Sequence, residues 1–292
     1  MSVRALAVLA SCAWVTACAT GPGAPPDVAV QAPTVERDIE PFAKAVESGR
    51  YASAVAGLRR VVQAHPDHTD AEILLARAYL GQGDVAPAGR LFEEAARAAT
   101  SPSQRSAALN GTGTVHLYAG ELAAAERAFR GALEVDARDA EAWNGLAQSL
   151  NRQGRGDAAE RAIRRAVRLE PDWRAAHNNL GMILLDAGEL AAAERAFADA
   201  HALAPDSAVV ANNLRLAIAL QGRYDEALAG VAEAGEPDAF NNIGYAALVR
   251  GDYDAADRYL RRAVEISPMY HREAHDNLRF LRGLRGDADA AS

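Results

Sequence analysis

The sequence predicts an all-α protein, a superhelical solenoid of about seven helix–turn–helix repeats followed by a C-terminal capping helix. Two observations carry this prediction. Hydrophobic residues make up 50% of the chain while aromatic residues make up only 6%, and much of the apolar share is alanine, which favours closely packed helices. Glycine and alanine also recur along the chain at a commonest interval of 34 residues, a period typical of stacked helix pairs.

Each repeat is marked by a glycine, an alanine five residues later, and a large apolar residue four residues after the alanine. We expect the glycine to end the first helix, because it adopts the left-handed conformation at least cost. The alanine lets the two helices approach closely, and the large residue fills the space between repeats. The glycines are Gly49, Gly83, Gly120, Gly154, Gly188, Gly222 and Gly251; the alanines are Ala54, Ala88, Ala125, Ala159, Ala193, Ala227 and Ala256; the large residues are Leu58, Phe92, Phe129, Ile163, Phe197, Val231 and Leu260.

Prolines are expected to stop the second helix of a repeat, because proline cannot continue a helix. The predicted array covers residues 35–271, and its sixth unit is about five residues short, with a second helix that ends near Gly235. The units are predicted to start near residues 35, 69, 106, 140, 174, 208 and 237. The prolines are Pro66, Pro171, Pro205 and Pro268, each twelve residues after a repeat alanine, and Pro102, fourteen residues after its own.

The best single repeat spans residues 174–207. Its signature residues are Leu180, Gly181, Leu184, Ala193, Phe197, Ala200 and Pro205. This pattern resembles the tetratricopeptide repeat (TPR), and the resemblance covers about 85% of the chain. It implies that the first helices of the repeats line a concave groove, and that the protein binds other proteins and is not an enzyme.

A lone amphipathic helix is predicted over residues 272–285, with Leu278 and Leu281 facing inward. The last repeat of an array leaves an apolar face uncovered, and a terminal helix with a polar outer surface covers it. Residues 286–292 are expected to be disordered.

The N-terminus carries a candidate export signal. Arg4 precedes an apolar run over residues 5–15, and the small residues that follow lead directly into Cys18. This resembles the lipobox of bacterial lipoproteins. The resemblance implies that residues 1–17 are a signal peptide and that Cys18 becomes the lipidated first residue. Residues 18–34, rich in glycine and proline, would then form a flexible tether.

Two alternatives to this processing remain open. Cys12 also follows small residues, but it leaves a shorter apolar core. Cleavage after Ala19 would release a secreted or periplasmic protein without lipid. In enteric lipoproteins an aspartate after the cysteine signals retention in the inner membrane. Ala19 occupies that place here, so the expected location is the periplasmic face of the outer membrane.

Charge and motifs limit the function classes. A formal net charge of -8 and a pI near 5.4 exclude a nucleic-acid partner, and leave the N-terminal lipid as the predicted membrane contact. The chain has no G-x-S-x-G, P-loop or H-E-x-x-H motif, so we expect no catalytic site, no cofactor and no small-molecule substrate. His271 and His275 are four residues apart, but without a third ligand we expect two solvated histidines and no metal site.

Asparagine recurs in two neighbouring columns of the first helices, although it costs roughly 0.6 kcal/mol against alanine in a helix interior. In the TPR family these positions face the groove, so the resemblance implies that they bind a partner segment together with Met182, Leu216 and Tyr245. The alternative, that the asparagines bridge neighbouring helices, is left open. The first column is Asn110, Asn144, Asn178, Asn212 and Asn241; the second is Asn179, Asn213, Asn242 and Asn277.

A lipobox followed by a TPR array with Asn-Asn motifs resembles the TadD/PilF-like lipoproteins of tight-adherence and type IV pilus assembly. The resemblance implies a membrane-tethered scaffold that binds an envelope protein, such as a secretin or a pilus component. An adaptor for peptidoglycan enzymes or periplasmic proteases is the first alternative. An enzyme or glycan binder that uses the groove is the remote one.

Overall fold

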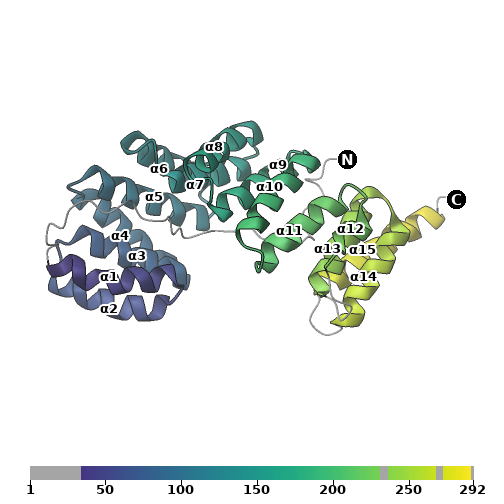
Figure 1. The fold of residues 1–292 in the computed structure, drawn as a ribbon, viewed down its shortest axis with the longest axis horizontal. Helices are drawn as coiled ribbons and strands as arrows, with labels where there is room; N and C mark the ends of the chain where they lie inside the picture. Colours follow the sequence, from purple (N-terminus) through teal and green to yellow (C-terminus); the bar gives the residue numbers. More distant parts are fainter. Residues whose placement is uncertain (1–33, 231–235, 268–271, 291–292) are drawn as a thin grey trace. The chain divides into compact units, whose positions relative to one another are not determined.

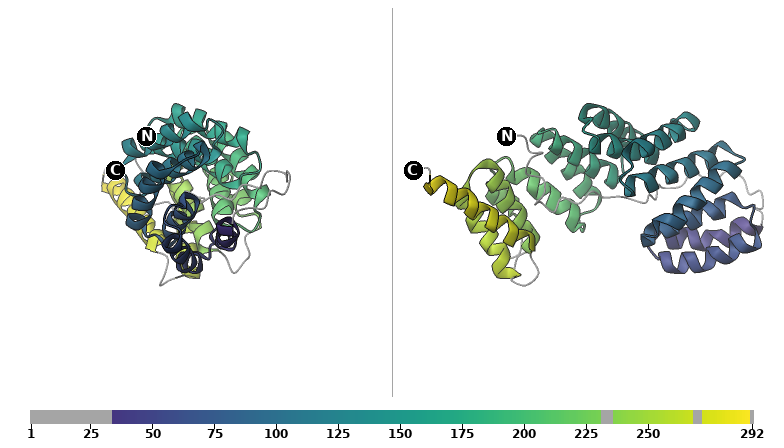
Figure 2. Two further views of the ribbon diagram at one scale, coloured as in Figure 1. Left: turned by 90° about the vertical axis from the view of Figure 1, so that its left-hand side faces the viewer. Right: turned by 180° about the vertical axis from the view of Figure 1, so that it is seen from behind.

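The computed structural model describes residues 34–230, 236–267 and 272–290 of the 292-residue chain, and every regular element in that part is a helix (Figure 1, Figure 2). The predicted all-α class is therefore confirmed. The helices form two compact units, one ending at Pro171 and the other beginning at Asp172. The predicted signal peptide and Cys18, together with Val231, Gly235, Pro268 and His271, lie outside the described residues.

The first unit consists of four successive helix pairs, and its first helices begin at or near the predicted starts of the first four repeats. The helices are α1 (Thr34–Glu47), α2 (Tyr51–Ala64), α3 (Thr69–Gln82), α4 (Val85–Ala98), α5 (Pro102–Tyr118), α6 (Leu122–Val135), α7 (Ala140–Arg152) and α8 (Gly156–Leu169).

The second unit contains three further pairs and the terminal helix, and most of its core forms one cluster of buried apolar side chains. Its first helices begin at the predicted starts. The helices are α9 (Arg174–Asp186), α10 (Leu190–Leu203), α11 (Ala208–Ala219), α12 (Tyr224–Ala227), α13 (Pro237–Arg250), α14 (Tyr253–Ile266) and α15 (Arg272–Ala290).

The turn inside each helix pair depends on glycine, as predicted. All seven repeat glycines adopt φ angles between 72° and 86°, in the left-handed region where a Cβ is unfavourable. After α3, the N–H of Gly83 donates to the carbonyl of Leu80 and that of Asp84 donates to the carbonyl of Tyr79, both at 2.9 Å. These bonds satisfy carbonyls that the end of the helix leaves without partners.

Glycines inside the first helices receive the large side chains of the second helices. An added Cβ on Gly181 of α9 would lie 2.5 Å from the Phe197 ring of α10. The Phe129 ring of α6 lies against two helices, since an added Cβ would meet it at 2.7 Å on Gly113 of α5 and at 2.3 Å on Gly145 of α7. The repeat alanines and the large residues are buried, with exposed fractions of 1% or less wherever the structure describes them. The predicted packing columns are thus confirmed.

One proline departs from its predicted role. Helices α2, α8 and α10 each end two residues before the expected proline, whereas Pro102 is the first residue of α5 and does not follow a helix end directly. Proline suits the first helical position because its missing N–H has no partner there. The Ser101 Oγ accepts from the Gln104 N–H at 3.2 Å, and the Gln104 side chain accepts from the Ser101 N–H at 3.3 Å. This capping box starts α5 before the predicted residue 106.

Two further boundaries are corrected. Helix α12 ends at Ala227, well before the predicted end near Gly235, and Gly230 follows with a φ of 79°. A left-handed glycine stops a helix, which explains the early end. At the C-terminus, α15 continues past the predicted end at Arg285 to Ala290. Leu278 and Leu281 of α15 are buried, as predicted. Within the described part, no helix combines the length and the apolar character that crossing a membrane requires.

Candidate functional site

The two asparagine columns are mostly buried. Eight of the nine predicted asparagines have exposed fractions of 6% or less, and only Asn212 is half-buried. Met182, Leu216 and Tyr245 are buried as well. Apart from Asn212, these side chains are therefore covered by neighbouring residues of the chain. Their contact with a partner stays a prediction.

In the second unit, asparagines bond from one repeat to the next. The Asn213 Nδ2 of α11 donates to the Asn178 Oδ1 of α9 at 2.9 Å, and the Asn277 Nδ2 of α15 donates to the Asn241 Oδ1 of α13 at 3.0 Å. In both pairs the second-column amide donates to the first-column amide of the preceding repeat. Each bond stabilises the stack by about 1 kcal/mol, which offsets the low helix propensity of asparagine. For these four residues, the interpretation that asparagines bridge neighbouring helices describes the structure.

In the first unit the same positions carry different chemistry. Gly111 and Gly145 occupy the second column, where they make room for large side chains of the preceding repeat. The Asn110 Nδ2 donates to the Glu141 Oε2 at 3.0 Å, and the Arg77 Nη2 donates to the same oxygen at 3.3 Å. This carboxylate therefore joins α3, α5 and α7, which are the first helices of three successive repeats.

Asp139 connects the start of α7 to the preceding repeat. Its Oδ1 accepts from the Ala142 N–H at 2.8 Å, and its Oδ2 accepts from the Ser106 hydroxyl at 3.1 Å. Burial raises the pKa of Asp139 above its ordinary value and the nearby Glu141 adds to the rise, although the bond from Ala142 opposes it. Burial, followed by the charges of Glu141 and Asp139, also raises the pKa of Glu170.

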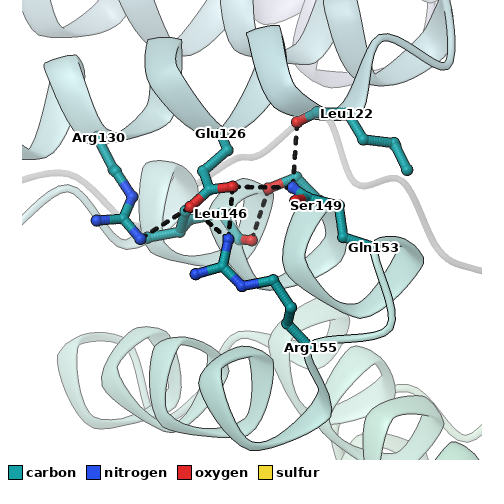
Figure 3. A network of polar contacts seen from close by, with 7 residues as sticks. All are labelled: Leu122, Glu126, Arg130, Leu146, Ser149, Gln153 and Arg155. Atoms are coloured by element: carbon teal, nitrogen blue, oxygen red, sulfur yellow. Dashed lines mark hydrogen bonds and ion pairs between the residues drawn. The ribbon is translucent and has the colours of Figure 1, made fainter.

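A second carboxylate, Glu126 of α6, collects three basic or amide side chains (Figure 3). Arg155 donates to both Glu126 oxygens at 2.8 Å, the Gln153 Nε2 donates to Oε2 at 3.0 Å, and Arg130 pairs with Oε1 at 2.8 Å. Gln153 also donates to the Leu122 carbonyl at 3.3 Å. Burial alone would raise the pKa of Glu126, but the bonds from Gln153 and Arg155 and the two arginine charges outweigh it and lower the pKa. We call this set of side chains the Glu126 cluster.

The same arrangement recurs two repeats later, and the sequence interpretation missed both copies. Gln221 and Arg223 each donate to the Glu194 Oε2 at 2.7 Å, and the pKa of Glu194 is lowered in the same way. The sequence does contain a signal for this arrangement, because its Glu, Gln and Arg each recur after 68 residues. The repeat between them differs, because Glu160 pairs with Arg164 of its own helix at 2.8 Å. Ala187 and Glu189 stand at the positions of Gln153 and Arg155 there.

The described residues contain no group of three or more His, Cys, Asp or Glu side chains placed to hold a metal ion. His275, one member of the histidine pair considered above, is exposed on α15.

The helix pairs, their glycine turns and their glycine-to-aromatic packing define a repeat protein of the tetratricopeptide class. Family models of the tetratricopeptide repeat match residues 45–109, 110–169, 146–208 and 237–269. The chain belongs to the tetratricopeptide-repeat proteins, which typically act as scaffolds for protein interactions. No curated protein sequence matches it.

Solved structures share the fold at low identity. A chain of the APC/C hetero-tetramer Cut9–Hcn1 aligns with a TM-score of 0.64 and 18% identity over 82% of this chain, which spans 48% of that chain. PilF of Pseudomonas aeruginosa aligns with a TM-score of 0.53 and 22% identity over 71% of this chain and 95% of its own. A thermophilic TPR protein of Thermus thermophilus, TTC0263, aligns with a TM-score of 0.53 and 22% identity over 67% of this chain and 99% of its own. These likenesses establish the solenoid fold of stacked repeats.

The Glu126 cluster predicts a pH-dependent contribution to stability. Because the folded protein lowers the pKa of Glu126, the contribution is present above the ordinary carboxyl pKa and is lost as pH falls through the folded value. Glu126→Gln should reduce the free energy of unfolding by about 1 kcal/mol at about pH 7 and by much less at about pH 3, in urea titrations.

Glu160→Gln is the matched control, since Glu160 pairs only within its own helix in the described contacts and should change stability little at either pH. An equal loss at both pH values for Glu126→Gln would contradict the charge-based account.

Proposed function

We propose that this protein is a membrane-tethered scaffold that binds another envelope protein along the first helices of its repeats. The observation that carries the proposal is the array of TPR helix pairs, on whose first helices the half-buried Asn212 leaves an amide within reach of a partner. Amides both donate and accept, so they suit the backbone of a bound segment in more than one register.

Among the asparagines of the two columns, Asn212 is the one that a partner can reach without a change in the helices. It is half-buried, and its Oδ1 accepts from the Arg215 Nη1 at 3.1 Å. Arg215 in turn pairs with Glu236 at 2.6 Å. The Asn212 Nδ2 can donate to a carbonyl of a partner backbone while the Asn212 Oδ1 keeps its bond from Arg215.

The tether and the pathway rest on the sequence. Small residues leading into Cys18 support lipidation, and two or three acyl chains would hold the protein firmly at a membrane. The resemblance to TadD/PilF-like lipoproteins supports a pilotin-like role in assembling a pilus or secretion machine, with a secretin or pilus component as the partner. The likeness to PilF itself, at 22% identity, concerns the fold.

Site-specific photo-crosslinking in the native host tests the partner class. A photo-reactive phenylalanine derivative replaces Asn212 on α11 or, as the control, the exposed Ala198 on the second helix α10. We expect a secretin or pilus component among the adducts of position 212 and not among those of position 198, as identified by mass spectrometry.

Either of two results would refute the pilotin-like role. Adducts with peptidoglycan enzymes or periplasmic proteases at position 212 would favour the adaptor alternative. Identical adducts from both positions would place the binding surface elsewhere. Equal thermal midpoints of both variants and the wild type establish that folding is not the cause.

Metabolic labelling with radioactive palmitate tests the tether. Cys18→Ser should abolish incorporation of the label and release the protein from the membrane fraction, whereas Cys12→Ser should leave both unchanged. The opposite pattern would assign the lipid to Cys12. An unlabelled wild type would indicate the secreted or periplasmic form.

A further inference from the structure

A groove lies along the second helices of the first unit, away from the asparagine columns. It has a volume of about 650 Å³ and runs between α6 and α8, with α7 as its floor. Leu146 and Leu150 of α7 form a buried apolar floor, with half-buried Leu133 and Trp143 beside them. Apolar side chains at the bottom of a groove offer a place for the apolar side chains of a bound segment.

Arginines line this groove, in a chain whose formal net charge is -8. Arg161, Arg165 and Arg168 all come from α8, and none of them forms an ion pair within the described part of the chain. Arg130 of α6 pairs with Glu126, and Glu134 is the acidic residue of the lining. Neighbouring Arg164, which does not line the groove, is neutralised by Glu160 at 2.8 Å. The uncompensated positive charge of α8 is thus concentrated on its groove side.

A related groove of about 760 Å³ lies between α2 and α4, above α3. Arg59 and Arg90 line it at the repeat positions of Arg130 and Arg161, and Leu75 stands at the position of Leu146. Glu94 occupies the position of Arg165, so this groove is less cationic. The combination of arginine walls and an apolar floor therefore occurs twice in the first unit, most strongly between α6 and α8.

We propose that the groove between α6 and α8 binds a segment of a partner protein that carries both carboxylates and apolar side chains. The planar guanidinium groups of Arg161 and Arg165 suit carboxylates, with which arginine forms paired hydrogen bonds. The leucines of α7 take the apolar side chains. The arginines of this surface come from second helices, and none of the asparagines of the two columns lines it.

Charge favours a short acidic segment over an extended polyanion. Fields of exposed charges are screened within about 8 Å at physiological ionic strength, so a short segment in the groove experiences mainly the nearby arginines. A nucleic acid or an anionic membrane would extend beyond them and meet the acidic remainder of the chain. A protein segment is therefore the occupant that the charge distribution fits.

Fluorescence anisotropy with the full chain in detergent tests this proposal. The probe is a labelled helical peptide of about sixteen residues, built from Glu, Leu and Ala with leucines on one face, and its counterpart has Gln in place of each Glu. We expect Arg161→Glu and Arg165→Glu each to weaken binding of the acidic peptide by about tenfold. Arg164→Glu, on the same helix but outside the groove, should change it less than about threefold.

Four outcomes would overturn the proposal. Equal binding of the Gln counterpart by the wild type, or no binding of the acidic peptide up to about 1 mM, would exclude carboxylate recognition. An equal loss in Arg164→Glu would indicate non-specific charge attraction. If vesicles of phosphatidylglycerol bind with the same dependence on Arg161 and Arg165 while the peptide does not, the groove recognises a lipid surface and not a protein.

Discussion

In three of the helix pairs, α5–α6, α9–α10 and α13–α14, a glycine of the first helix lies against a large side chain of the second. At Gly181 and Gly145 no Cβ fits beside the facing ring, so the helices can approach as closely as they do only with glycine there. The Phe129 ring extends this contact beyond its own repeat, because it lies against Gly113 of α5 and Gly145 of α7. The same interaction therefore builds a repeat and stacks it on the next, which is how repeat arrays gain stability from nearest neighbours.

Hydrogen bonds and ion pairs between successive repeats then fix the position of one repeat against the next. The Asn178–Asn213 bond and the Glu126 cluster both link side chains of one repeat to those of the next. Buried amides and carboxylates are costly unless they are paired, so these bonds favour one arrangement of the helices over alternatives. A stack fixed in this way keeps its exposed side chains at defined spacings, which is what a protein-binding scaffold requires.

The packing of this fold was predictable from the sequence, whereas its polar sites were only partly so. The repeat glycines end helices and the repeat alanines allow two helices to pack closely, so each column has a single physical role. The structure confirmed the helix pairs that these columns predicted. Pro102 was misassigned because proline can follow one helix or begin the next, and the Ser101 capping box decides between them. Asparagine is more ambiguous still, because the same amide suits a ligand or a neighbouring helix. Only the structure could show that Asn213 bonds to Asn178.

Amide hydrogen exchange on Gly181→Ala tests most directly the claim that nearest-neighbour packing holds the stack. The added methyl group meets the Phe197 ring and should destabilise its repeat by about 1–3 kcal/mol. We predict the greatest loss of protection in α9 and α10, a smaller loss in α11, and the least in α13 to α15. Gly156→Ala, where an added Cβ meets nothing within 4 Å, should lose no protection. An equal loss from α9 through α15 would contradict the account, since it would mean that the unit opens as a whole.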